Sequence, residues 1–137
     1  MGSERASAGG HGEGRQILVI DDDPTILELM TAVLTEEGYA VDAALTGNAV
    51  LADGSGIRPP ELVVLDMFLP GISGAELAEA LRAKYGAELP ILVTSASSVE
   101  DQAQAFGAYD YLSKPFDLET LLAGVRRGLP PRQDGSS

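Results

Sequence analysis

Segments with strand and helix character alternate five times along this chain, and this alternation constrains its fold more than any other sequence feature. Ile17–Ile20 and Leu62–Leu65 are unbroken apolar runs, typical of strands buried on both faces of a parallel sheet. Between them, apolar residues recur at helical spacing after Pro24 until Gly38. The pattern predicts an α/β fold, a parallel sheet covered by helices on both faces. The expected strands are 17–20, 39–44, 62–65, 91–93 and 110–112, and the expected helices are 24–37, 47–57, 75–85, 99–106 and 118–125.

The chain has the size and composition of one domain. Its 137 residues are 45% hydrophobic, and the absence of cysteine excludes disulfides and thiolate metal sites and suits a reducing cytoplasm. We expect the domain at 16–128, between a flexible N-terminal lead at 1–15 and a flexible C-terminal tail at 129–137. The longest apolar stretch, Leu62–Leu69, is too short to span a bilayer, and the lead lacks the apolar core of a signal peptide. We therefore expect a cytoplasmic chain without a membrane segment.

The charge balance narrows the class of partner. Nine Lys and Arg residues stand against 21 Asp and Glu residues, for a formal net charge of -12. Nucleic-acid surfaces need clustered basic side chains to contact phosphates, so we expect no nucleic-acid partner. Proteins and cations are the expected partners.

Polar side chains follow four of the expected strands. The first strand ends in Asp21–Asp23, the third in Asp66, the fourth in Thr94–Ser95, and the fifth leads to Lys114. Ligands of open parallel sheets bind beyond the carboxyl ends of the strands, where these groups would converge. Oxygen donors without His or Cys favour Mg²⁺ or a similar cation, and such a metal usually serves phosphate chemistry.

Several of these acids also allow simpler interpretations. Asp23 precedes Pro24 and is expected to cap the following helix, so no ligand role is given to it. Asp21 and Asp22 could also be capping acids, but two adjacent like charges at a buried strand end favour a bound cation. Asp66 is isolated among apolar residues, and it could form a salt bridge with Lys114, act as a nucleophile, or do both.

Short motifs follow several of the expected strands in a fixed order. They are Asp21-Asp22 after the first strand, Asp66 within Leu65–Pro70 with Gly74 beyond it, Ser95-Ala96 after the fourth strand, and Lys114-Pro115-Phe116 after the fifth. In this order the chain resembles the receiver domains of two-component response regulators, as a stand-alone, chemotaxis-regulator-like module, over about residues 16–128. The resemblance implies a flavodoxin-like (βα)5 three-layer sandwich whose five-stranded parallel sheet has the order 2-1-3-4-5.

The resemblance also implies a metal site and a phosphoryl acceptor. Asp66 would take the phosphoryl group, and Asp22 and Asp66 would contribute carboxylate oxygens to Mg²⁺, for which Mn²⁺ could substitute. Asp21 would act largely through a bound water, and Phe68 would supply its backbone carbonyl. These roles agree with phosphoryl transfer, which depends on positioning and on neutralisation of charge.

Further roles follow from the same resemblance. Ser95 would donate a hydrogen bond to a phosphoryl oxygen, and Lys114 would pair first with Asp66 and then with the phosphoryl group. The Lys114–Pro115 bond is expected to be cis. Tyr111 matches the switch aromatic, which moves inward when Ser95 is drawn onto the phosphoryl group; the alternative is a half-buried strand tyrosine that never moves.

The chain also departs from the family pattern. Between Ser95 and Lys114 it is about three residues shorter than is usual, roughly one helical turn, so we expect a shortened helix 4 at 99–106. Phe68 and Ser97 occupy the two variable positions beside the phosphoryl site and are expected to tune its lifetime. An apolar Phe68 would exclude the attacking water, unless the ring turns away toward the surface or a partner.

These features predict a phospho-accepting module that catalyses only its own phosphorylation and dephosphorylation. The phosphoryl donor would be a sensor histidine kinase or a histidine phosphotransfer protein, and the output would reach a downstream protein target not yet known. One alternative is a degenerate receiver that binds a partner without phosphorylation, although the retained acids, hydroxyl and lysine argue against it. Another is a phosphatase with an aspartate nucleophile, but such hydrolases usually carry the nucleophile on the first strand.

Overall fold

The computed structural model describes residues 12–96 and 107–130, in which strands and helices alternate as expected. The helix expected at 99–106 lies outside the described residues, so its shortening stays a prediction. The strands are β1 Gln16–Ile20, β2 Ala40–Ala44, β3 Leu62–Asp66, β4 Ile91–Ser95 and β5 Asp110–Ser113, and the helices of the described part are α2 Pro24–Glu36, α3 Gly47–Leu51, α4 Gly74–Tyr85 and α6 Leu118–Gly128.

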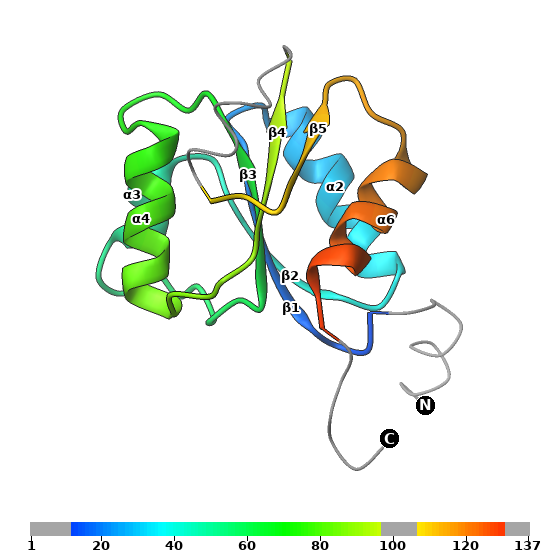
Figure 1. Cartoon of the computed structure of the whole chain (residues 1–137), viewed down its shortest axis with the longest axis horizontal. Helices are drawn as coiled ribbons and strands as arrows, with labels where there is room; N and C mark the ends of the chain where they lie inside the picture. Colours follow the sequence, from blue (N-terminus) through cyan, green and yellow to red (C-terminus); the bar gives the residue numbers. More distant parts are fainter. Residues whose placement is uncertain (1–11, 97–106, 131–137) are drawn as a thin grey trace.

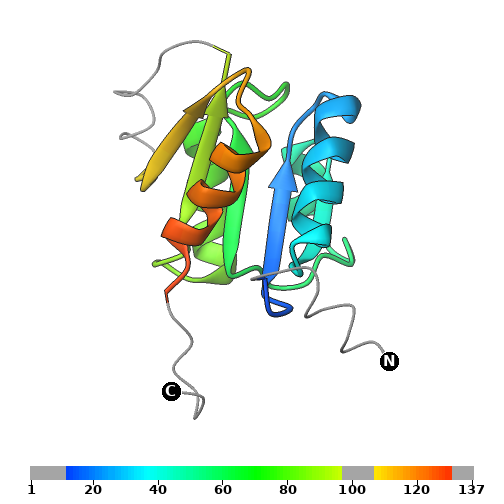
Figure 2. The same ribbon diagram turned by 90° about the vertical axis from the view of Figure 1, so that its right-hand side faces the viewer.

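The five strands form one parallel sheet in the order β2-β1-β3-β4-β5, which confirms the predicted order and the flavodoxin-like fold. Helices α3 and α4 cover one face and α2 and α6 the other, so the molecule has three layers (Figures 1 and 2). The chain moves outward from β1 to β2 and then crosses to β3 on the other side of β1. Strand order therefore reverses between β1 and β3, the point at which open α/β sheets bind ligands.

Each face of the sheet carries its own apolar core. In β1, Leu18 and Ile20 belong to the cluster beneath α3 and α4, whereas Ile17 and Val19 belong to the cluster beneath α2 and α6. All four side chains are wholly buried. Burial on both faces explains why the strand is continuously apolar instead of alternating.

Local sequence explains where the first two helices begin and end. The Asp23 carboxylate accepts hydrogen bonds from the amides of Thr25 and Ile26, at 2.9 and 3.3 Å, so the expected cap of α2 is confirmed. Helix α3 ends at Leu51, well before the expected 57. The backbone is already extended at Ala52, with a ψ angle of 143°, and Gly54 and Gly56 beyond it have φ angles of +73° and +79°, outside the helical region.

Described residues outside the expected domain limits also make contacts. The amide of Gly12 donates to the carbonyl of Glu37 at 2.8 Å, and Arg15 Nη1 donates to the carbonyl of Pro130 at 2.7 Å. The two ends of the described chain are thus held near each other, at the end of the sheet opposite the carboxyl ends of the strands (Figure 1). None of the helices in residues 12–96 and 107–130 has the length and apolarity needed to cross a membrane.

Candidate functional site

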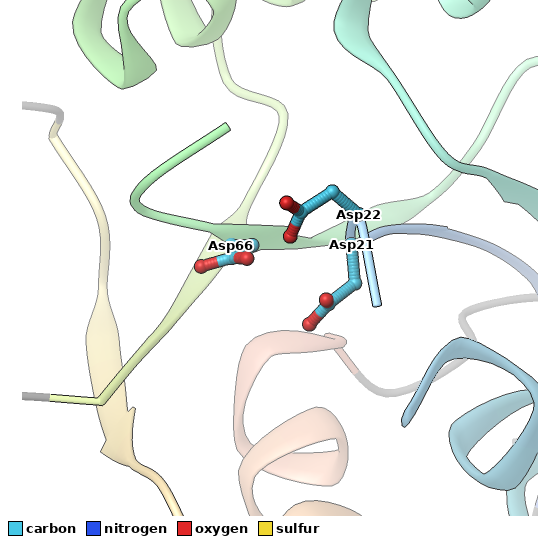
Figure 3. Close-up of side chains that lie close together, drawn as sticks. All are labelled: Asp21, Asp22 and Asp66. Carbon is cyan, nitrogen blue, oxygen red and sulfur yellow. The ribbon is translucent and has the colours of Figure 1, made fainter. Parts of the chain in front are cut away.

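Three carboxylates meet where β1 and β3 end. Asp21 and Asp22 directly follow β1, Asp66 is the last residue of β3, and the register pairs Ile20 with Leu65 just before them. One oxygen from each carboxylate lies within 4.8 Å of the others, and Figure 3 shows the three side chains gathered around one space. Asp21 is wholly buried, Asp66 is 6% exposed and Asp22 is exposed. The predicted acid cluster therefore forms, and solvent reaches it from the Asp22 side.

Backbone amides orient two of these carboxylates. Asp21 Oδ1 accepts a hydrogen bond from the amide of Asp23 at 2.9 Å, and Asp66 Oδ1 accepts one from the amide of Phe68 at 3.2 Å. Each bond spans two residues, the arrangement by which an aspartate fixes the turn that follows it. These bonds use only the Oδ1 atoms, so the Oδ2 atom of each side chain can interact with a cation.

Lys114 follows the edge strand β5 and brings an ammonium group to the acids from that edge of the sheet. Its Nζ atom lies 2.9 Å from Asp21 Oδ2 and 3.6 Å from Asp66 Oδ2. Its backbone amide donates to the carbonyl of Ser95 at 2.6 Å, which places it beside the end of β4, and the Lys114–Pro115 bond is cis as expected. The expected first partner, Asp66, is the more distant one. The Asp21 carboxylate is wholly buried, where an unpaired charge is costly, and its pairing with Lys114 offsets that cost.

The pKa shifts of Asp66 and Lys114 show how burial and neighbouring charges act in this cluster. Burial raises the pKa of the Asp66 carboxyl above its ordinary value, the charge of Asp21 raises it further, and the Lys114 ammonium opposes both. Burial alone would lower the pKa of Lys114, but the hydrogen bond to Asp21 and the charge of Asp66 raise it. A cation held between the carboxylates would relieve the repulsion between them. Three carboxylates without a nitrogen or sulfur donor fit a hard divalent ion such as Mg²⁺.

Of the other residues predicted for the site, the structure describes Ser95, Tyr111 and Phe68. Ser95 ends β4 and is wholly buried. Tyr111 in β5 is half-buried and packs against the cluster beneath α3 and α4. The Phe68 side chain is 58% exposed, and Ser97 lies outside the described residues. Thr94, which precedes Ser95, is wholly buried, and its Oγ1 atom has no hydrogen-bond partner among the described residues.

Comparison with known proteins decides the family. Residues 17–126 match the family model of the response regulator receiver domain. The chain belongs to this family. The receiver domain is 40% identical over 115 residues to the DNA-binding dual master transcriptional regulator RpaA of Synechocystis sp., covering 81% of the chain and 47% of RpaA. It is 42% identical over 113 residues to the transcriptional regulatory protein KdpE of Mycobacterium tuberculosis, covering 80% of the chain and 49% of KdpE. It thus spans about half the length of the curated relatives it matches.

Solved structures agree with this assignment. The response regulator protein TrrA of Thermotoga maritima, solved in complex with Mg²⁺-BeF, is 37% identical, with a TM-score of 0.70 over 84% of this chain and 99% of TrrA. The chemotaxis protein CheY4 of Vibrio cholerae is 31% identical, with a TM-score of 0.75 over 84% of this chain and 98% of CheY4. The fold and the family of the domain are therefore known, and its acid cluster is the candidate site.

Proposed function

We propose that this receiver domain accepts a phosphoryl group on Asp66 in a Mg²⁺-dependent reaction. The donor is the phosphohistidine of a sensor histidine kinase or of a histidine phosphotransfer protein. The observation that carries the proposal is the convergence of Asp21, Asp22 and Asp66 with the Lys114 ammonium at the carboxyl ends of the strands. A buried nucleophile beside an ammonium and a set of metal-binding oxygens is what phosphoryl transfer requires.

The donor set of the cluster suits a divalent metal. Asp22 and Asp66 would bind it through carboxylate oxygens, Asp21 largely through a water, and Phe68 through its backbone carbonyl, with Mn²⁺ able to replace Mg²⁺. When bound, the ion supplies positive charge next to the phosphoryl oxygens. The structure of the relative TrrA in complex with Mg²⁺-BeF supports this proposal.

The domain's own residues supply the rest of the chemistry. A carboxylate oxygen of Asp66 attacks phosphorus, the phosphorus–nitrogen bond of the phosphohistidine breaks, and the imidazole leaves with the electron pair, so that Asp66 becomes an acyl phosphate. The Lys114 ammonium and the Ser95 hydroxyl then bind phosphoryl oxygens. The domain catalyses only this transfer and the later hydrolysis of its own acyl phosphate, whose lifetime Phe68 and Ser97 tune.

The phosphoryl group acts through a change of surface. Ser95, drawn onto the phosphoryl group, leaves space into which the half-buried Tyr111 ring moves, and the altered face binds a downstream protein in the cytoplasm. Two packings that differ by a few kcal/mol are enough for such a switch. The acting unit is the domain at 16–128.

Intact mass after incubation with acetyl phosphate and Mg²⁺ tests the proposal. The wild type should gain one phosphoryl group, and Asp66→Asn should gain none because an amide is not an anionic nucleophile. A chelator should abolish labelling of the wild type. Equal labelling of Asp66→Asn would contradict the assignment, and the absence of any labelling would favour a receiver that only binds a partner. Turnover of a small phosphomonoester would instead favour a phosphatase.

A further inference from the structure

Thr94 carries a buried hydroxyl that the proposed chemistry does not use. Its side chain is wholly buried in β4, and Oγ1 has no hydrogen-bond partner among the described residues. Buried polar groups in folded proteins nearly always have a partner, so an unpaired hydroxyl is destabilising and needs an explanation. Valine has almost the same shape and would avoid this cost in a strand core.

The Thr94 side chain lies on the same face of the sheet as the Asp66 side chain. The register places Thr94 beside Asp66 of the neighbouring strand β3. Side chains alternate between faces along a strand, so residues two positions apart share a face. The residues two positions before Asp21, Asp66, Thr94 and Lys114 all belong to the apolar cluster beneath α2 and α6; they are Val19, Val64, Leu92 and Leu112.

The Lys114 side chain passes over the end of β4 to reach the acids. It starts just beyond β5, whereas Asp66 ends β3 and Asp21 follows β1, and β4 lies between β5 and β3. The ammonium is now closer to Asp21, at 2.9 Å, than to Asp66, at 3.6 Å. It therefore contacts both carboxylates and lies nearer to that of Asp21. Closer pairing with a phosphoryl group on Asp66 would shift it from Asp21 toward Asp66, which the register places beside Thr94.

The donors and acceptors at this point are complementary. A lysine ammonium has three N–H donors, and that of Lys114 meets two carboxylates, of Asp21 and Asp66, among the described residues. The Thr94 hydroxyl can accept a hydrogen bond and has no partner there. A third acceptor on the β4 side would fix the direction of the ammonium once it moves away from Asp21.

We propose that Thr94 is a positioning residue of the phosphoryl-acceptor site. Its hydroxyl accepts a hydrogen bond from the Lys114 ammonium when that ammonium pairs with a phosphoryl group on Asp66. The role rests on the proposed function, because it concerns the state in which Asp66 receives phosphate. Thr94 does not bind the metal, so its effect should appear in the rate of phosphorylation and not in the affinity for Mg²⁺.

Two substitutions at Thr94 and one matched control test the proposal. Thr94→Val removes the hydroxyl and keeps the shape, and Thr94→Ser keeps the hydroxyl. Tyr85→Phe removes the other buried hydroxyl that has no partner among the described residues; that ring packs on the opposite face, against the cluster beneath α3 and α4. The rate of labelling by acetyl phosphate is measured by intact mass, the Mg²⁺ affinity by calorimetry, and the free energy of unfolding in urea.

The rate of labelling should fall about tenfold in Thr94→Val, the scale of one hydrogen bond to a charged group that forms on the way to the transition state. It should stay within about twofold of the wild type in Thr94→Ser and Tyr85→Phe. The Mg²⁺ affinity should be the same in the wild type and the three variants. Thr94→Val and Tyr85→Phe each remove an unpaired hydroxyl, and neither should lower the free energy of unfolding.

Three results would overturn the role of Thr94. They are a wild-type rate in Thr94→Val, a rate in Thr94→Ser as low as that in Thr94→Val, or a loss of Mg²⁺ affinity that parallels the loss of rate. If the wild type itself is not labelled, the proposed function fails and takes this role with it. A labelled wild type with an unaffected Thr94→Val overturns the role of Thr94 alone.

Discussion

Asp66 is a buried carboxylate close to a second one, Asp21, and the two share the Lys114 ammonium. Burial and the charge of Asp21 raise the pKa of Asp66, so the folded chain holds the Asp66 proton more tightly than the unfolded chain does. Between the unfolded and the folded pKa values, the unfolded state binds fewer protons at this group. Asp66 therefore makes the free energy of unfolding fall as the pH rises between these two pKa values. Above the folded pKa, this loss of stability has reached its full size.

Asp66→Asn should remove this cost. We expect a higher free energy of unfolding than that of the wild type at neutral pH, with a gain that shrinks as the pH falls below the raised pKa of Asp66. Urea denaturation at a series of pH values measures it, and Asp53→Asn, at an exposed turn after α3, serves as the control. A loss of stability at neutral pH would mean that the Lys114 pair outweighs burial and repulsion.

At the scale of single elements, the three consecutive acids Asp21–Asp23 have two different roles. Asp21 and Asp22 belong to the acid cluster, and Asp23 caps α2. Asp23 accepts hydrogen bonds from the helix amides of Thr25 and Ile26 and belongs to the helix, although it is adjacent in sequence to the cluster. Asp23→Ala should lower the free energy of unfolding by about 1 kcal/mol. Asp23→Asn should keep most of the stability because the amide oxygen can accept the same bonds.

The capping role of Asp23 has a matched control in Asp117, which caps α6 by accepting from the amide of Thr120. Asp117→Ala should lose stability to a similar extent in urea denaturation. Neither variant should change the Mg²⁺ affinity. A loss of Mg²⁺ affinity in Asp23→Ala that matched the loss in Asp22→Ala would instead make Asp23 a ligand of the metal.

The elements show which parts of the structure the sequence predicts and which it does not. Strands such as β1 were predicted because full burial leaves an unbroken apolar run, a signal that needs no knowledge of distant residues. The acid cluster was predicted because parallel strands end at the same edge of a sheet. The closer pairing of Lys114 with Asp21 was not, because it depends on distances between side chains from strands that are not neighbours. The unpaired Thr94 hydroxyl also appears only once all its neighbours are in place.

At the scale of the whole molecule, the site exists only when the sheet is complete. Its acids and its ammonium come from positions 21 to 114, and the order β2-β1-β3-β4-β5 brings these distant positions together. In an unfolded chain these positions are far apart, so a divalent ion held by this site would bind the folded state alone. Metal affinity and global stability are therefore linked, because a ligand that binds only the folded state stabilises it by mass action.

Mg²⁺ should raise the free energy of unfolding of the wild type, by about 2.7 kcal/mol at a concentration one hundred times the dissociation constant. The increment should be largely lost in Asp22→Ala if Asp22 is the direct ligand that we propose, and only partly lost in Asp21→Ala if Asp21 acts through a water. Because Asp21 also holds Lys114 at 2.9 Å, Asp21→Ala will change stability without metal as well. The comparison therefore uses the difference between urea curves with and without Mg²⁺ for each protein. Asp53→Ala controls for non-specific screening by Mg²⁺ of the negative charges of this chain, whose net charge is -12. If Asp21→Ala loses more of the Mg²⁺-dependent increment than Asp22→Ala does, the two ligand roles are reversed.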